Sequence, residues 1–146
     1  MNLRRSKKLS RRLVAAAAFG DLPRVRALLR AGAGPGRADA DGTTPLYAAA
    51  VQGEAAVARA LLAAGAPPDA ESGFGSEGTP LCAAACWGHT EAVRALLEHG
   101  ADPRLREDHG TGRTALERAA AGPYPDVVEL LTAAGAQSPP PPRGRS

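Results

Sequence analysis

A motif of seven residues occurs three times in this chain of 146 residues, and the copies are evenly spaced. The copies are residues 44–50, 79–85 and 114–120, and their leucines, Leu46, Leu81 and Leu116, are 35 residues apart both times. A Leu-Leu pair and then a Gly-Ala pair follow each copy. Repetition at such a period predicts a solenoid, because one short unit cannot bury its apolar face without a neighbour.

Each repeat contains the signals of two helices separated by a tight turn. Thr44 and Thr79 can cap the first helix by accepting a backbone N–H. A proline follows each threonine, at the first helical position, where no donor is needed. Gly53 and Gly88 allow a tight turn at the end of that helix, and a second amphipathic helix follows. The pattern predicts helix–turn–helix units joined by projecting hairpin loops.

Several features recur together at fixed offsets: Thr-Pro-Leu, the alanine pair, the turn glycine, the leucine pair and the Gly-Ala. In this combination the chain resembles the ankyrin repeat family. The resemblance covers about residues 11–137, which includes an earlier half-unit around Leu13 and Leu28 that lacks Thr-Pro. It implies an all-α ankyrin-repeat solenoid of stacked helix–turn–helix units with projecting hairpin loops. It also implies a concave surface of loop tips and first helices that binds another protein, and no catalysis.

The composition fits such a stack and argues against a β-sandwich or a β-barrel. Alanine supplies 33 residues, whereas isoleucine is absent and only two Phe, two Tyr and one Trp occur. Packed β-sheets need β-branched and aromatic residues. The paired alanines of each first helix have no bulk, so we expect neighbouring helices to approach closely.

Aligning the units on one another, with equivalent positions in one column, gives a repeat frame that divides the chain into three parts. Four units are expected at about residues 11–38, 39–69, 70–104 and 105–137, between a basic N-terminal arm at residues 1–10 and a disordered Pro/Arg tail at residues 138–146. Some positions that are apolar in the inner units are polar in the terminal units, namely Arg24 in the first unit and Arg118 and Thr132 in the last. Terminal units of a solenoid need polar outer faces, so we expect a complete domain of four units.

The net charge of +3 and the isoelectric point of about 9.3 hint at nucleic acid or an anionic membrane as partner. The basic residues concentrate at the two ends, however: residues 1–12 carry +6 and residues 138–146 carry +2, while the repeats carry −5. The acidic stack favours a protein partner over nucleic acid. Binding of nucleic acid or an anionic surface through residues 4–12 is the alternative, although this segment lacks the aromatic residues that stack on bases.

Aromatic residues occupy positions where a partner would bind. Phe19, Gln52 and Trp87 share one column of the frame, just before the turn glycine, and by resemblance this column lies on the concave surface. Phe74 lies in the long loop that precedes the second copy of the motif, residues 79–85. Exposed aromatic side chains are favoured anchors in interfaces. The alternative is that Phe19 packs under the first turn and that Trp87 lies flat on a neighbouring loop.

The loops between the units are acidic. Residues 36–43, 69–78 and 102–113 contain eight acidic and four basic residues, which is also typical of ordinary solvated loops. A concave face edged by these loops would prefer a basic or neutral partner segment. The candidate partner-binding residues are Phe19, Asp41, Gln52, Phe74, Glu77, Cys86, Trp87, Arg106, Asp108 and His109.

The sequence offers no constellation of catalytic or metal-binding residues. Cys82 and Cys86 are four residues apart on a predicted helix and His89 follows, but no third and fourth ligand stands at a suitable spacing. The three histidines are scattered, and no nucleophile motif accompanies them. We therefore expect a non-enzymatic protein with no catalytic residues, no cofactor and no metal.

The N-terminus imitates a targeting signal. A basic run precedes the apolar residues 13–20, as in an export signal, and the acid-free start resembles a transit peptide. The apolar run coincides with the first helix of the repeat frame, so cleavage would remove half of the first unit. It is also too short to span a bilayer. Two cysteines give no disulfide framework. We expect a cytoplasmic monomer that contacts no membrane.

Overall fold

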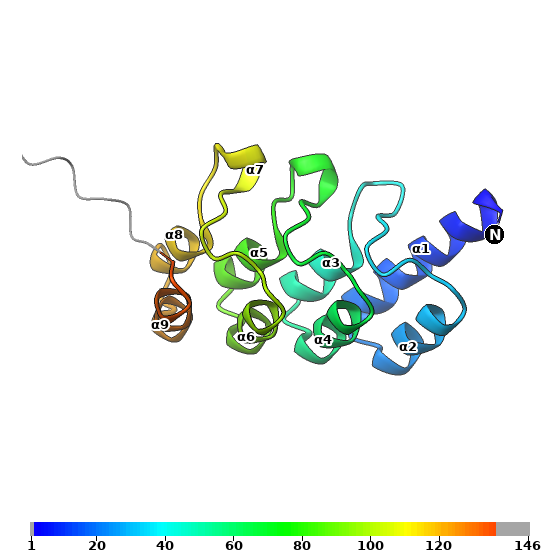
Figure 1. Ribbon diagram of the computed structural model, residues 1–146, viewed down its shortest axis with the longest axis horizontal. Coiled ribbons are helices and arrows are strands. Elements are labelled where there is room, and N and C mark those ends of the chain that lie inside the picture. Colours follow the sequence, from blue (N-terminus) through cyan, green and yellow to red (C-terminus); the bar gives the residue numbers. More distant parts are fainter. Residues whose placement is uncertain (1, 137–146) are drawn as a thin grey trace, which may run out of the picture.

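The computed structural model describes residues 2–136, and its regular structure there is helical. The helices are α1 (Leu3–Phe19), α2 (Leu22–Arg30), α3 (Pro45–Val51), α4 (Ala55–Ala63), the short 3₁₀ helix η1 (Gly73–Gly75), α5 (Pro80–Cys86), α6 (Thr90–Glu98), α7 (Glu107–Gly110), α8 (Ala115–Ala120) and α9 (Pro125–Ala133). Figure 1 shows α1, α3, α5 and α8 side by side in one row, with α2, α4, α6 and α9 in a second row. The hairpin loops project from the first row, on the side away from the second. The predicted all-α solenoid is confirmed.

Threonine caps begin the first helices, as the repeat pattern predicts. The hydroxyl oxygens of Thr44, Thr79 and Thr114 accept hydrogen bonds from the backbone nitrogens three residues later, at 3.2, 3.2 and 3.1 Å. In α3 and α5 a proline occupies the first turn, where a backbone donor would have no partner within the helix. The turn that follows α5 is tight, because Gly88 has a φ of 71° and a Cβ atom there would lie 2.3 Å from the ring of Tyr124.

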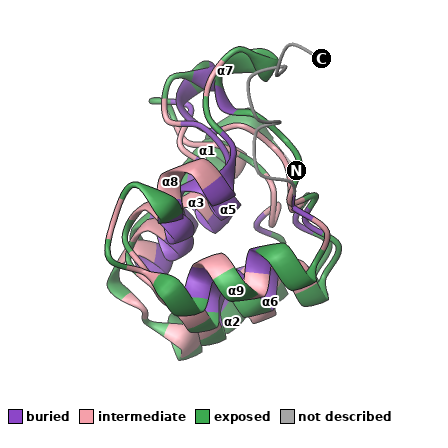
Figure 2. Cartoon of the chain, turned by 90° about the vertical axis from the view of Figure 1, so that its left-hand side faces the viewer, coloured by how far each residue is buried: buried purple, intermediate pink, exposed green. Residues whose placement is uncertain are grey.

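The core lies between the two rows of helices and between neighbouring units, where Figure 2 shows the buried residues. The largest fully buried side chains include Leu13, Leu46, Leu61, Leu96 and Leu131. In the first helices, Ala49, Ala84 and Ala119 are fully buried as well. Since α1 packs on α3, α3 on α5 and α5 on α8, these small side chains let the helices of the first row approach closely.

Helix α1 begins at Leu3 rather than near Leu13, where the repeat frame placed the start of the first helix. The side chain of Asn2 caps it by accepting a hydrogen bond from the backbone nitrogen of Arg5 at 2.9 Å. Leu9 is buried one turn before Leu13 and so extends the apolar stripe of the helix. Residues 3–10 of the predicted basic arm are therefore part of a continuous helix.

Of the three polar residues at the ends of the frame, two are exposed and the third, Arg118, is half-buried. Arg24 and Thr132 are exposed, whereas the residues of the same columns in inner units are buried or half-buried. The tail predicted at residues 138–146 lies outside the described residues. None of the helices within residues 2–136 has both the length and the apolar character needed to cross a membrane.

Replacing the cap of α5 should destabilise the stack. Thr79→Ala removes a buried hydroxyl that binds the backbone nitrogen of Cys82, and it should lower the free energy of unfolding by about 1 kcal/mol. The matched control is Thr132→Ala, because that hydroxyl is exposed and donates only to the carbonyl of Val128 within α9. The control should change stability by less than about 0.5 kcal/mol in urea unfolding. Equal effects of the two substitutions would show that the cap has no role.

Candidate partner-binding face

We define the concave face as the hairpin loops, residues 39–43, 71–78 and 106–113, together with the last turns of α1, α3, α5 and α8. Figure 2 looks along the stack, and the hairpin loops there stand at an angle to the first helices. The candidate partner-binding residues predicted from the sequence were expected on this surface.

Three aromatic side chains of the concave face are exposed. Phe19 is the last residue of α1, Trp87 caps the C-terminus of α5 and Phe74 lies in η1, with exposed fractions of 86%, 60% and 81%. The alternative arrangement, with Phe19 packed under a turn, does not fit these fractions. The polar candidates Asp41, Gln52, Arg106, Asp108 and His109 are also exposed, whereas Glu77 and Cys86 are half-buried.

The two longer hairpin loops share one backbone conformation. Three consecutive residues in each have positive φ angles, namely residues 73–75 and residues 108–110. The bonds that close the loops also correspond: Ser72 N donates to Gly78 O at 2.8 Å, and Glu107 N donates to Arg113 O at 2.9 Å. Left-handed backbone costs energy in residues that carry a side chain, so contacts around the loops must hold it in place.

Those contacts come from the preceding loop. The ring of Phe74 lies against Gly42, where a Cβ atom would stand 2.9 Å from the ring carbons. His109 has the same relation to Gly75. Its backbone nitrogen donates to Glu71 Oε1 at 2.8 Å, and its Nδ1 lies 3.2 Å from Glu71 Oε2. Phe74 and His109 are thus equivalent residues of consecutive loops, each packed on a neighbour while its outer side faces solvent.

Glu77 has a structural role that its acidic character did not indicate. Its Oε1 accepts hydrogen bonds from the hydroxyl groups of Thr43 at 2.9 Å and Ser72 at 2.8 Å. Ser72 Oγ in turn accepts one from the backbone nitrogen of Thr44 at 3.0 Å. Glu77 therefore ties its own loop to the preceding one, and a charge reversal there would disturb both loops.

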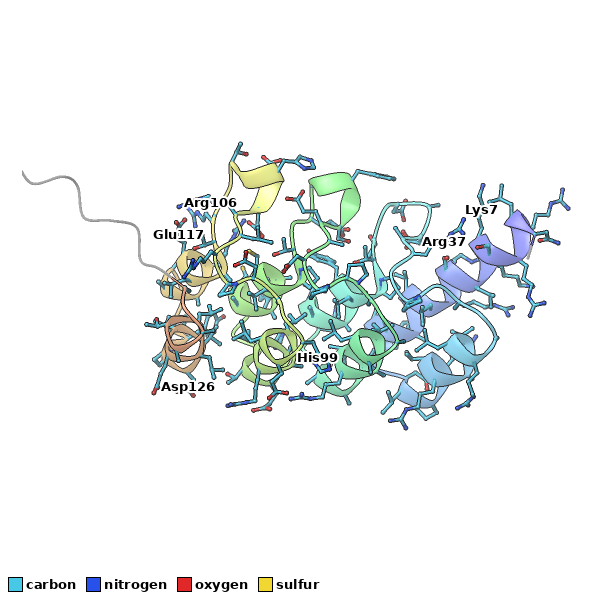
Figure 3. The ribbon with its side chains drawn as sticks, viewed as in Figure 1. Lys7, Arg37, His99, Arg106, Glu117 and Asp126 are labelled. Carbon is cyan, nitrogen blue, oxygen red and sulfur yellow. The ribbon has the colours of Figure 1, made fainter. Side chains whose placement is uncertain are left out.

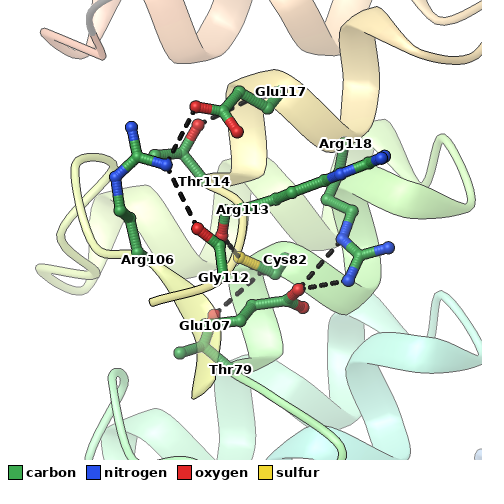
Figure 4. Close-up of polar contacts among 9 residues, drawn as sticks. All are labelled: Thr79, Cys82, Arg106, Glu107, Gly112, Arg113, Thr114, Glu117 and Arg118. Atoms are coloured by element: carbon green, nitrogen blue, oxygen red, sulfur yellow. Dashed lines mark hydrogen bonds and ion pairs between the residues drawn. The ribbon is translucent and has the colours of Figure 1, made fainter. Parts of the chain in front are cut away.

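In the last hairpin loop, a buried carboxylate is paired with the arginine that the sequence placed at the end of the stack. Glu107 is buried, and Nε and Nη2 of Arg118 both donate to its Oε2, the former at 2.9 Å (Figure 4). This hydrogen bonding raises the pKa of Arg118. Arg106 donates to Gly112 O and contacts Glu117, both at 3.1 Å. The one sequence signal for the Glu107 pair was Arg118 itself, which stands where the other units have alanine.

The two cysteines differ in their access to solvent. Cys82 is buried with its Sγ 3.8 Å from the carbonyl oxygen of Arg113, and burial raises the pKa of its thiol to about 12. Cys86 is half-buried, immediately before Trp87 in the chain. Within residues 2–136, no group of three or more His, Cys, Asp or Glu residues is placed to hold a metal ion.

A cavity that the sequence interpretation missed lies at the N-terminal end of the stack. Its volume is about 780 Å³, and its walls are the first half of α1 and residues 37–41 of the first hairpin segment. Its basic lining residues are Arg4, Lys7, Lys8, Arg11 and Arg37. Figure 3 shows Lys7 and Arg37 at the end of the stack where α1 begins. The signal was present in the sequence, because residues at positions 4, 7, 8 and 11 share one face of a helix.

A family model described as ankyrin repeats in three copies matches residues 13–107 and 65–139 of the chain. The chain belongs to the ankyrin repeat family. The match extends over all four helix pairs, so the family expected from the repeated motif is confirmed. A search of curated proteins finds no match to the chain.

Ankyrin repeats generally act as protein–protein interaction modules, and the family is typically non-enzymatic. In this ankyrin repeat protein, the hairpin loops and the ends of the first helices carry the exposed aromatic side chains. The contact with Gly42 holds Phe74 in a fixed position among them.

Removing the partner of the buried carboxylate should destabilise this ankyrin repeat protein. Arg118→Gln should lower the free energy of unfolding by about 1–2 kcal/mol, less than for a fully buried pair because the Arg118 side chain is 36% exposed. The control Arg94→Gln breaks an exposed pair with Glu91 at 3.5 Å and should cost less than about 0.5 kcal/mol. Urea unfolding measures both, and equal small losses would contradict the role given to Glu107.

The two thiols should react at very different rates. At mildly alkaline pH, Ellman's reagent should modify Cys86 in the folded protein and reach Cys82 only after unfolding, because burial and a pKa of about 12 keep the Cys82 thiol protonated. Cys86→Ala should abolish the fast reaction and Cys82→Ala should leave it intact. Modification of both thiols at one rate would be incompatible with the packing of α5.

Proposed function

We propose that this ankyrin repeat protein is a non-enzymatic scaffold that holds a segment of another protein on its concave face. The observation that carries the proposal is the exposure of both phenylalanines and the single tryptophan on this face, while alanine, leucine and valine fill the core. Exposed aromatic side chains are costly to keep in water unless a partner covers them, and they supply much of the affinity of interfaces.

The fixed geometry of the loops also supports binding. Phe74 is held on Gly42, and Glu77 joins its loop to Thr43, so the loops need little reordering when a partner docks. Preorganised groups lose less conformational freedom on binding, which leaves more of the contact energy for affinity.

Charge points to a basic or neutral segment as the ligand of this face. Asp41 and Asp108 are exposed on the hairpin loops, and Gln52 adds a neutral hydrogen-bonding group at the end of α3. The proposed contact residues are Phe19, Asp41, Gln52, Phe74, Cys86, Trp87, Arg106, Asp108 and His109, with Glu77 placed behind them as a support. We propose that the protein acts as a cytoplasmic monomer.

Truncating the central aromatic side chain should reduce partner capture without loss of the fold. We expect Trp87→Ala to lower recovery of partners from a lysate of the source cell at least about tenfold in quantitative mass spectrometry. The free energy of unfolding should change by less than about 0.5 kcal/mol, because the side chain is 60% exposed.

The matched control for that experiment is Leu3→Ala, which also truncates an exposed apolar side chain, 62% exposed, but at the far end of α1. It should capture the same partners as the unaltered protein. A partner profile that Trp87→Ala leaves unchanged would contradict the proposed use of the concave face.

A further inference from the structure

We infer that the N-terminal end of the stack holds a second binding site, a basic groove that takes an acidic segment of a protein. The basic groove is the cavity lined by Arg4, Lys7, Lys8, Ser10 and Arg11 of α1 and by residues 37–41. Residues 39–41 of the first hairpin loop belong to both the groove and the concave face, but none of the exposed aromatic residues of the concave face lines the groove. The inference goes beyond the proposed function and does not depend on it.

The shape of the groove suits a peptide. The basic residues of α1 recur at helical spacing and so line one wall, and the opposite wall is the segment from Arg37 to Asp41. The volume of about 780 Å³ lies within the usual range of ligand sites, about 300–1,000 Å³. A few side chains of an extended segment fit in such a space.

The charges of the groove are unbalanced. Five cationic side chains line it, and none of them takes part in an ion pair among residues 2–136. One of the two carboxylates in the groove already makes hydrogen bonds within its own loop: Asp39 Oδ1 accepts from the backbone nitrogens of Asp41 at 2.9 Å and Thr43 at 3.0 Å. Cations gathered without counter-charges repel one another, and an anionic ligand relieves that repulsion.

An unsatisfied hydroxyl group stands at the inner wall of the groove. Ser10 is 1% exposed, and its Oγ has no hydrogen-bond partner among the described residues. Buried hydroxyl groups nearly always have a partner. Ser10 therefore supplies a donor for an anionic oxygen that enters the groove between Lys7, one helical turn before Ser10, and Arg11, the next residue of the helix.

The lining favours discrete carboxylates over a phosphate backbone. No aromatic side chain lines the groove, so bases have no surface on which to stack. Asp39 and Asp41 stand among the cations and would repel phosphates that are fixed in a strand backbone, whereas the flexible side chains of a Glu-rich peptide can turn their carboxylates toward the cations and away from the two aspartates.

The test measures fluorescence anisotropy of three labelled probes with the full chain: an oligoglutamate peptide, an oligoglutamine peptide of equal length and an oligothymidylate. The oligoglutamate should bind and weaken as salt rises, and the oligoglutamine should not bind. The double variant Arg4→Gln, Arg11→Gln should weaken oligoglutamate binding at least about tenfold.

The control is the double variant Arg5→Gln, Arg12→Gln. It makes the same two substitutions as the first double variant, at the same spacing on the same helix and with the same loss of charge. These arginines, however, line a different hollow, between α1 and α2. It should weaken oligoglutamate binding less than about threefold. Circular dichroism checks that both variants keep α1 folded.

Three results would overturn the inference: equal weakening in the two double variants, tighter binding of oligothymidylate than of oligoglutamate, or no oligoglutamate binding by the unaltered protein. Trp87→Ala should leave oligoglutamate binding intact. Failure of the basic groove and failure of the concave face are therefore distinguishable.

Discussion

The close approach of the first helices is the constraint on which the rest of this structure depends. Each helix pair buries its apolar face only against its neighbours, so the units are stable only as a stack. The contact is possible because alanines stand in the row of first helices, where Ala49, Ala84 and Ala119 are fully buried. Leucines of both rows then fill the space between the rows. The alanine excess of the composition is thus a condition of the architecture.

Because alanine and leucine fill the core, the large aromatic side chains remain at the surface. Because Ala, Leu and Val close the core, Phe19 and Trp87 can remain at the ends of first helices without weakening the stack. The same spacing brings consecutive hairpin loops within reach of one another, so that Phe74 and His109 each rest on the preceding loop. The distance between units therefore determines both the packing of the core and the shape of the concave face.

Features that depend on local chemistry could be predicted from the sequence. The caps at Thr44 and Thr79, the turn at Gly88 and the helix pairs follow from residue types at fixed offsets, and the structure has them where the pattern placed them. The aromatic candidates Phe19, Phe74 and Trp87 are exposed at the helix ends and in the loop where the sequence pattern places them.

Features that depend on contacts between loops could not be predicted. The roles of Glu77 and Glu107 arise from partners in another loop or helix, and the left-handed turns hold their shape through the contacts of Phe74 and His109 with the preceding loop. The basic groove is a different case. Its helical spacing is visible in the sequence, but the repeat pattern begins only near Leu13, so residues 1–10 are predicted as a basic arm. The buried Leu9 extends the apolar stripe, and with it the helix, into that segment.

The most direct test of this account is the stability of Ala84→Leu, measured by urea unfolding beside Ala63→Leu. Ala84 is fully buried in the row of first helices, and Ala63 is exposed at the end of α4. If small side chains set the helix spacing, Ala84→Leu should lower the free energy of unfolding by at least about 2 kcal/mol. Ala63→Leu should change it by less than about 0.5 kcal/mol. Equal, small effects would contradict the claim that alanine packing holds the stack together.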